Sequence, residues 1–146
     1  MTKISVKKLD DRAVLPKYGS DFAAGADLYA LLDAPLVIAS GETSLIKTGL
    51  ALEIPVGYGG FIYARSGLAT KTGLAPANKV GVIDSDYRGE IIVALHNHSS
   101  IDTTVECGER IAQMVIAPAP QFAFEEANEL SSSERGEGGF GSTGKK

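Results

Sequence analysis

Two carboxylates lie two residues apart in the stretch NKVGVIDSDYRGE, residues 78–90. On an extended backbone Asp84, Asp86 and Arg88 would share one face, because side chains alternate along a strand. A carboxylate pair at this spacing can hold a metal ion or activate a water molecule. A solvated acidic turn, with Arg88 as a surface partner, is the other interpretation of the same residues.

The stretch ARSGLA, residues 64–69, combines groups that bind anions. Arg65 and Ser66 follow the end of a predicted strand, and Gly67 permits an unusual backbone conformation. A guanidinium, a hydroxyl and free backbone N–H groups at a helix start favour a phosphate or a carboxylate. The alternative is a helix cap, in which Ser66 is the N-cap residue and Arg65 lies on the surface.

Two further stretches carry polar groups that a fold alone would not need. Gln113 interrupts the apolar run of GERIAQM, residues 108–114, so either the strand faces solvent there or the amide contacts a polar ligand. Arg135 precedes GGFGST, whose glycines leave backbone N–H groups free to bend around an anion. The composition of this end of the chain also fits a disordered terminus.

His96, His98 and Cys107 are weaker candidates. The two histidines have the i, i+2 spacing that a metal could use, but there is no third histidine and Cys107 is distant in the sequence. We therefore expect surface polar residues. Cys107, the only cysteine, can form no intrachain disulfide and lacks a nearby basic residue, which favours a packed thiol over a nucleophile.

Short strands separated by turns must position these residues. Glycines (17) and prolines (6) punctuate β-branched runs. The predicted strands are 4–9, 27–31, 36–38, 43–52, 60–63, 89–98, 102–105 and 111–117, with a helix at 66–71. Asn78 and Gly81 flank a tight reversal that predicts a hairpin. Many short strands predict an antiparallel sandwich or barrel.

Composition indicates one soluble domain. The chain has 146 residues, of which 44% are hydrophobic. A formal net charge of −4 argues against an extended nucleic-acid surface, but not against a small anionic ligand. No run resembles a signal peptide or a membrane span, so we expect a cytoplasmic protein, or a nuclear one in a eukaryote. From about residue 125 the chain becomes polar and rich in Ser and Gly, which predicts a flexible tail.

Taken together and in order, five stretches resemble the five motifs of the trimeric dUTPase family, the deoxyuridine triphosphate nucleotidohydrolases. They are AGADLYA at 24–30, RSGLA at 65–69, NKVGVIDSDYRGE at 78–90, GERIAQM at 108–114 and RGEGGFGSTG at 135–144. These stretches span nearly the whole chain. One departure is Ala64, where many members carry Pro; it affects loop rigidity and removes no functional group.

The resemblance implies an all-β fold, a distorted jelly-roll barrel or sandwich with one short helix and a flexible C-terminal tail. Residues 1–124 would form the jelly-roll domain. Residues 125–146 would form an arm that closes over an active site of a neighbouring subunit. The resemblance also implies a homotrimer with shared active sites at its interfaces, which binds dUTP and neither nucleic acid nor membrane.

The implied reaction is hydrolysis of dUTP to dUMP and pyrophosphate, which keeps uracil out of DNA and supplies dUMP for thymidylate synthesis. Asp84 would be the general base that activates a water for in-line attack on the α-phosphorus, with Asp86 as the rival carboxylate. Mg²⁺ would be held by the substrate phosphates rather than directly by protein, with Asp27 acting through a metal-bound water.

The resemblance also assigns substrate contacts. Backbone groups of residues 78–84 would read uracil, Tyr87 would pack on the deoxyribose, and Phe140 would stack on the base. The substrate-binding residues that it implies are Arg65, Ser66, Gly67, Asn78, Gly81, Val82, Ile83, Asp84, Tyr87, Gln113, Arg135, Phe140, Gly141, Ser142 and Thr143.

Other functions fit parts of the sequence. A dCTP deaminase or bifunctional relative would share the fold, but the tyrosine-bearing hairpin and glycine-rich tail look like those of the hydrolase. A non-catalytic nucleotide-binding regulatory module would leave its filled catalytic positions unused. A generic β-sandwich interaction module explains none of the five stretches.

Overall fold

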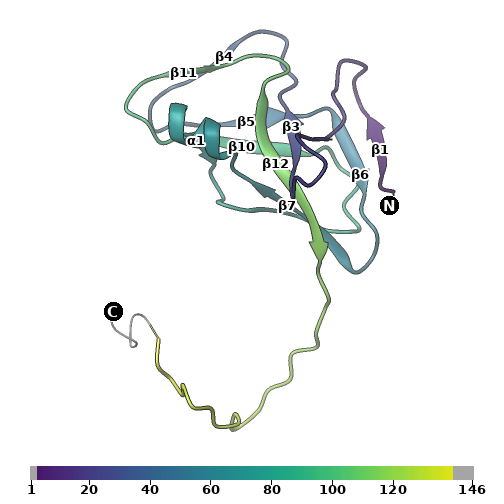
Figure 1. The fold of residues 1–146 in the computed structure, drawn as a ribbon, viewed down its shortest axis with the longest axis vertical. Coiled ribbons are helices and arrows are strands. Elements are labelled where there is room, and N and C mark those ends of the chain that lie inside the picture. Colours follow the sequence, from purple (N-terminus) through teal and green to yellow (C-terminus); the bar gives the residue numbers. More distant parts are fainter. Residues whose placement is uncertain (1–2, 140–146) are drawn as a thin grey trace.

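Antiparallel strands and one short helix, α1 (Ser66–Thr72), make up the part of the chain that the computed structural model describes, residues 3–139 (Figure 1). The strands are β1 (Ser5–Lys8), β2 (Lys17–Tyr18), β3 (Ala26–Tyr29), β4 (Leu36–Ile38), β5 (Thr43–Lys47), β6 (Leu50–Glu53), β7 (Tyr58–Tyr63), β8 (Leu74–Pro76), β9 (Gly81–Ile83), β10 (Ile92–Asn97), β11 (Thr103–Val105) and β12 (Arg110–Pro118). The predicted all-β class with one short helix is confirmed.

The largest sheet has five strands in the order β2-β3-β12-β7-β9. A second sheet has the order β5-β10-β8, and two strand pairs, β1-β6 and β4-β11, complete the body. Apart from β2 and β3, neighbours within each sheet are far apart in sequence. Most pairings are therefore long-range crossovers, as in Greek-key and jelly-roll architectures.

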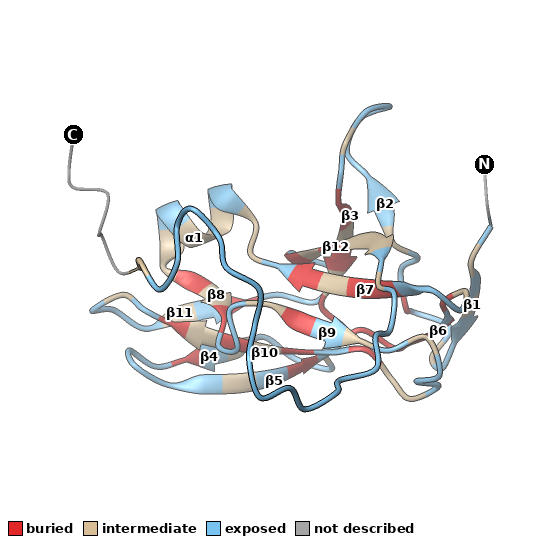
Figure 2. Ribbon diagram, turned by 90° about the horizontal axis from the view of Figure 1, so that it is seen from below, coloured by how far each residue is buried: buried red, intermediate tan, exposed pale blue. Residues whose placement is uncertain are grey.

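The core lies between the sheets, where the inward faces of β3, β10 and β12 meet (Figure 2). Leu28, Leu95 and Ile111 from these regions are almost fully inaccessible to solvent. On β12, Ala112 and Met114 are buried and Gln113 between them is only half-buried. Alternation along this strand therefore directs the amide of Gln113 away from the core.

The predicted strand at 43–52 is two strands. The break falls at Gly49, whose φ of +69° few residues other than glycine adopt. A Cβ there would also lie 2.6 Å from the Leu31 side chain. β5 pairs with β10 before the break, and β6 pairs with β1 after it.

The hairpin predicted around Asn78 and Gly81 is also wrong. A tight turn is present, with Lys79 at a φ of 65° and its N–H donating to the Pro76 carbonyl. However, β8 before the turn pairs with β10, whereas β9 after it pairs with β7. The turn therefore carries the chain from one sheet to the other.

An arm follows β12. Its described residues, 119–139, contain no helix or strand, and Figure 1 shows them leaving the body of the molecule. Within residues 3–139 no helix combines the length and the apolar character that crossing a membrane requires.

Candidate active site

Strand β12 brings three of the five stretches singled out in the sequence together. Its neighbours are β3 on one side and β7 on the other, so Gln113 lies opposite Asp27 and also opposite Tyr63 at the end of β7. Arg65 follows two residues later. Residues 24–30, 65–69 and 108–114 therefore meet at one place on the five-stranded sheet.

Asp27 is the centre of the polar network at that place. Arg65 donates from Nε to its Oδ1 (2.7 Å), and Arg110 donates from Nη1 to its Oδ2 (3.2 Å). Arg65 Nη1 also donates to the main-chain carbonyl of Arg110 (3.2 Å). The Asp27 side chain is only 13% exposed. One carboxylate between two guanidiniums leaves the network with a net positive charge, which suits an anion.

This network borders a cleft of about 230 Å³, which we call the Asp27 cleft. Its lining residues are Gly19, Ala23, Gly25, Asp27, Arg65, Ser66, Gly67, Arg110 and Gln113. Gln113 donates from Nε2 to the Ala64 carbonyl (2.9 Å). A Cβ on Gly25 would lie 2.6 Å from Gln113 Oε1, so only glycine lets β3 and the amide approach this closely.

The capping alternative for ARSGLA is wrong. Helix α1 starts at Ser66, and its N-cap residue is Arg65, whose side chain makes no capping hydrogen bond. The guanidinium is not on the surface but is paired with Asp27, and the Arg65 side chain is 24% exposed. Of the two interpretations, the anion site fits the position of Arg65.

The two carboxylates at 84 and 86 lie elsewhere, after β9. The chain turns there, because the Tyr87 N–H donates to the Asp84 carbonyl (3.2 Å). The extended face predicted for Asp84, Asp86 and Arg88 is therefore absent from this stretch. Both carboxylates are exposed, and Arg88 donates to the Ser85 carbonyl (2.7 Å). We call residues 81–87 the Asp84 region.

Tyr87 folds back over the turn that follows. Its hydroxyl donates to the Glu90 carbonyl (3.0 Å), and its ring passes over Gly89. A Cβ at Gly89 would lie 2.4 Å from the Tyr87 hydroxyl oxygen, so the glycine makes room for this orientation. The ring is 43% exposed and borders a shallow cleft of about 170 Å³ with Val82 and Asp84.

A larger cleft, about 600 Å³, lies on another side of the Asp84 region. Its lining residues are Val56, Gly57, Tyr58, Gly59, Phe61, Val82, Ile83, Asp84, Ser85, Asp86, Ala119 and Gln121. Strand β9 contributes to both clefts as the edge strand of the five-stranded sheet, so one side of its backbone has no partner strand among residues 3–139.

The two regions lie toward opposite ends of β7. Ile83, just before Asp84, pairs with Gly60 near the start of that strand, whereas Arg65 follows its end. Five residue steps of extended chain separate Gly60 from Arg65, which is roughly 16 Å at ~3.3 Å per residue. Neither cleft at the Asp84 region shares a lining residue with the Asp27 cleft.

Comparison with known proteins identifies the family. The dUTPase family matches residues 11–144. A deoxyuridine 5'-triphosphate nucleotidohydrolase of Desulfitobacterium hafniense is 53% identical over 143 residues, which cover 97% of this chain and 95% of that protein.

The chain belongs to the dUTPase family.

Solved structures of dUTPases agree with this assignment. The dUTPase of Staphylococcus bacteriophage 80alpha, solved with dUPNHPP, is 31% identical, covers 99% of both chains and has a TM-score of 0.91. A dUTPase from phage phi11 of S. aureus, whose structure shows the coordination of a structural Mg(II) ion, is 24% identical with a TM-score of 0.78 over 88% of this chain and 99% of that chain. The predicted family and jelly-roll class are confirmed.

The fifth dUTPase motif lies in the arm and is only partly described. Arg135 donates from Nε to the Gly138 carbonyl (2.7 Å), which closes a local turn. The other predicted substrate contacts of this motif, Phe140, Gly141, Ser142 and Thr143, lie outside the described residues.

The remaining candidates of the sequence do not join the dUTPase motifs. His98 is exposed, and His96 is hydrogen-bonded to Thr43 Oγ1 through Nδ1 (2.8 Å). The two imidazole rings meet edge to face (4.4 Å between centroids, 66°). Partial desolvation, followed by the charges of His96 and Lys79, lowers the pKa of His98. Across residues 3–139, no three His, Cys, Asp or Glu side chains are grouped to hold a metal.

Cys107 is exposed, so the predicted packed thiol is wrong. The residue lies in the turn before β12. Its Sγ approaches the Ala30 carbonyl (3.8 Å) and the Leu32 N–H (3.5 Å). It therefore bridges to the chain segment after β3 while remaining open to solvent.

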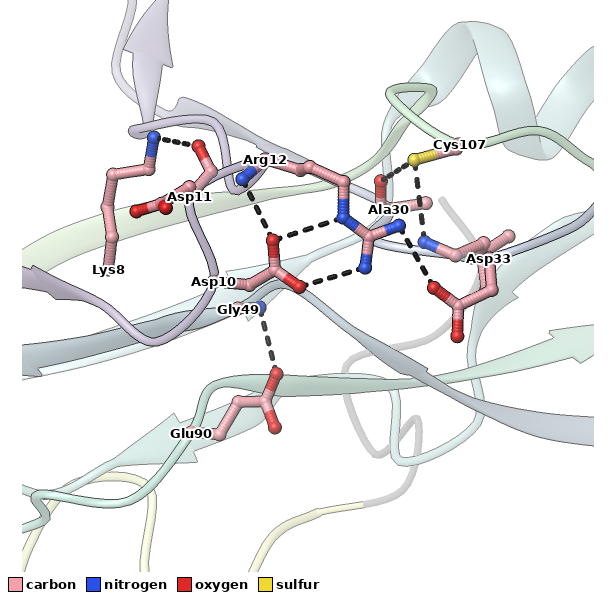
Figure 3. A network of polar contacts seen from close by, with 10 residues as sticks. Lys8, Asp10, Asp11, Arg12, Ala30, Asp33, Gly49, Glu90 and Cys107 are labelled. Atoms are coloured by element: carbon pink, nitrogen blue, oxygen red, sulfur yellow. Dashed lines mark hydrogen bonds and ion pairs between the residues drawn. The ribbon is translucent and has the colours of Figure 1, made fainter.

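A second arginine–carboxylate cluster, outside the dUTPase motifs, offers a useful contrast (Figure 3). Arg12 pairs with Asp10 (2.8 Å) and Asp33 (2.9 Å), and its side chain is 53% exposed. Hydrogen bonds from Arg12 lower the pKa of Asp10 to about 2. This cluster joins two surface loops and borders a different cleft, which shares no lining residue with the Asp27 cleft.

Proposed function

We propose that this protein hydrolyses dUTP to dUMP and pyrophosphate. The observation that carries the proposal is that the described family motifs fall into two regions with complementary chemistry. The Asp27 cleft presents guanidinium groups suited to phosphates. The Asp84 region presents an edge strand, an aromatic ring and exposed carboxylates.

The base is read by the backbone of residues 78–84. Uracil presents an N3–H donor between two carbonyls, and the unpartnered edge of β9 can offer matching main-chain groups. Cytosine lacks the N3 proton and would leave such groups unpaired. Hydrogen-bonded sites reject analogues of this kind by roughly 10⁴-fold or more. Gly81, Val82 and Ile83 form this edge, and Asn78 lies in the turn before it. The closed turn would also exclude thymine's 5-methyl group by steric clash.

The sugar packs against Tyr87. Because the hydroxyl is bonded to the Glu90 carbonyl and the ring crosses Gly89, the ring is held in one orientation. A deoxyribose fits against a ring held in this way, whereas a ribose 2′-hydroxyl finds no room. This contact selects deoxynucleotides.

The phosphate chain is bound by the Asp27 cleft. Arg65, Ser66, the Gly67 amide and Gln113 supply donors from one chain. The arm of another copy adds Arg135, Ser142 and Thr143, with Phe140 stacked on the uracil. Closure of this arm excludes water from the reacting groups.

A magnesium ion fits this scheme only together with the substrate. The described residues offer no cluster of three ligands, and Mg²⁺ prefers phosphate oxygens and retained waters. Asp27 could bind a metal-bound water, because its carboxylate has about four acceptor positions and two are used by arginines. Mg²⁺ would neutralise charge on the phosphate oxygens.

Asp84 is the general base. It accepts a proton from a water whose oxygen bonds to the α-phosphorus, while the bond to the bridging oxygen breaks and pyrophosphate leaves. Asp84 suits this role because its side chain is exposed directly after β9, the strand proposed to bind the uracil. Positively charged groups and backbone donors stabilise the charge that builds on phosphate oxygens.

The active site is shared between copies of the chain in a homotrimer. The separation of Asp84 and Arg65 near opposite ends of β7 in one chain supports a pairing of the Asp27 cleft of one copy with the Asp84 region of another. The arm, which leaves the body in Figure 1, can reach a neighbouring copy. We expect this assembly to act in the cytosol, or the nucleus of a eukaryote, and to remove dUTP while supplying dUMP for thymidylate synthesis.

The test is hydrolysis of a nucleotide panel with and without Mg²⁺. We expect pyrophosphate release from dUTP and little from dTTP, UTP or dCTP, with activity lost on chelation. Ammonia release from dCTP would instead indicate a deaminase. Equal turnover of UTP and dUTP would contradict the proposed site.

A further inference from the structure

We infer that Arg110 is a positioning residue, which fixes Arg65 for the phosphate chain by holding Asp27 from its other side. This role rests on the proposed function, because it assigns Arg110 to the same phosphate cleft. Arg110 is not among the site residues predicted from the sequence. Its place in the network singles it out.

The contacts of Asp27 show why Arg110 matters. The carboxylate accepts Arg65 Nε on Oδ1 and Arg110 Nη1 on Oδ2. With both oxygens engaged, the carboxylate plane cannot rotate without breaking one of the two charge-assisted bonds. Without Arg110, Oδ2 would lose its guanidinium, and the group that orients Arg65 would gain rotational freedom.

Arg65 is the side chain that benefits. A free arginine side chain has many rotamers, and ordering it when a ligand binds costs conformational entropy. A side chain that is already held in place loses little further entropy on binding. Here Nε is bonded to Asp27 and Nη1 to the main-chain carbonyl of Arg110. Arg65 Nη2 has no hydrogen-bond partner among the described residues. Its two N–H donors therefore remain available to a phosphate oxygen.

Arg110 itself is placed to hold rather than to bind. It is the first residue of β12, where the register with β3 shifts between Arg110 and Ala112. This irregularity brings its side chain to Asp27 while leaving it 51% exposed. The residue thus acts on the substrate through Asp27 and Arg65.

The experiment compares Arg110→Gln and Arg110→Lys with the wild-type full-length protein. We expect KM for dUTP and the inhibition constant of inorganic pyrophosphate to rise about tenfold in Arg110→Gln, the loss of about one charge-assisted bond. In Arg110→Lys, which keeps a cation but not the planar fork, they should rise about threefold. The inhibition constant of deoxyuridine, which has no phosphate, should stay at the wild-type value in both variants.

Arg12→Gln is the matched control, since Arg12 is likewise paired with carboxylates, those of the surface-loop residues Asp10 and Asp33, but lies in the separate cluster of Figure 3. It should leave both inhibition constants and KM unchanged. In the Asp27→Asn background, Arg110→Gln should raise KM no more than about twofold further, because its effect passes through Asp27.

Three outcomes would overturn the inference. The first is a wild-type KM in both Arg110 variants. The second is a parallel rise for deoxyuridine, which indicates general disruption. The third is an undiminished tenfold effect in the Asp27→Asn background, which indicates direct contact with phosphate. If Arg110→Gln does not fold, Arg110→Lys decides by the same readouts. A wild-type protein that fails to hydrolyse dUTP would instead refute the proposed function.

Discussion

The Asp27 cleft and the Asp84 region are built in opposite ways. The cleft lies on interior strands of the sheet, and its charged and amide side chains are tied to protein partners. The Asp84 region lies on an edge strand and the turn that follows it, and its carboxylates are exposed. Under the proposed function, one chain therefore carries a preformed phosphate-binding cleft and, separately, an open surface for the uracil and the reaction.

The difference follows from the neighbours that each strand has. β12 has a partner on each side, so a single residue such as Gln113 faces two strands and can fix groups from both. Within the described part of the chain β9 pairs with β7 alone, which leaves its other edge for a ligand or another chain. If the two regions act separately, substitutions in the Asp27 cleft should change mainly KM and substitutions in the Asp84 region should change mainly kcat or selectivity.

Asp84→Asn should have the largest effect and should act on turnover alone. General-base catalysis contributes about 10²–10⁴-fold, so kcat should fall by at least that order. KM for dUTP should change little, because the Asp27 cleft is intact. Steady-state kinetics measure both quantities. Asp86→Asn, two residues on and also exposed, is the control; if it abolishes turnover while Asp84→Asn does not, the base is Asp86.

Truncation after Ser133 should have the next largest effect. It removes Arg135 and the rest of the fifth motif but none of the residues of either region. We expect the trimer to persist by native mass and turnover to fall about 10²-fold, since a missing lid leaves the site open to water. Normal dUTP hydrolysis by the truncated protein would remove the arm from the active site.

Gly25→Ala should damage the phosphate-binding cleft and spare the reaction. The new methyl group would lie 2.6 Å from Gln113 Oε1 and push the amide from its place in the cleft. We expect KM for dUTP to rise about tenfold, the cost of roughly one hydrogen bond to a charged group, with a smaller change in kcat. Arg12→Gln is the control, because Arg12 lies outside the Asp27 cleft and outside the Asp84 region. Equal effects of the two substitutions would argue against a role for Gln113.

Gly89→Ala should have the smallest effect and should appear in sugar selectivity. The methyl group would lie 2.4 Å from the Tyr87 hydroxyl oxygen and displace the ring. Thermal stability should change little, since the ring can move toward solvent. The preference for dUTP over UTP, measured as the ratio of kcat/KM values, should drop several-fold. An unchanged ratio would show that Tyr87 does not select the sugar.

Several residues of the Asp27 cleft can be predicted from the sequence one by one, but the hydrogen-bond network that joins them cannot. Arg65, Ser66 and Gln113 could be named from their chemistry, because polar groups beside apolar strands need a purpose. Arg110 could not, since its role depends on β12 lying beside β3, which brings its side chain to Asp27, 83 positions away in the sequence. A charged residue directly before an apolar strand was the one available signal.

The Asp84 region was less predictable in shape. Alternation along an extended strand suggested one face for Asp84, Asp86 and Arg88, but the hydrogen bond from Tyr87 to Asp84 bends the chain. Similarly, the residues at 78–81 predict the turn correctly, but they do not show that the strands on either side of it join different sheets. Strands of two or three residues, such as β2, β8 and β9, are too short for a periodic pattern to reveal.

The most direct measurement mixes two inactive chains. Arg65→Ala lacks a phosphate-binding side chain and Asp84→Asn lacks the general base. Each variant alone should be nearly inactive. If each active site combines Arg65 of one copy with Asp84 of another, random trimers co-expressed at equal levels should recover about a quarter of wild-type dUTP turnover, since about one site in four holds both intact groups. Mixed trimers, verified by native mass, that remain as inactive as either parent would contradict a site shared between subunits.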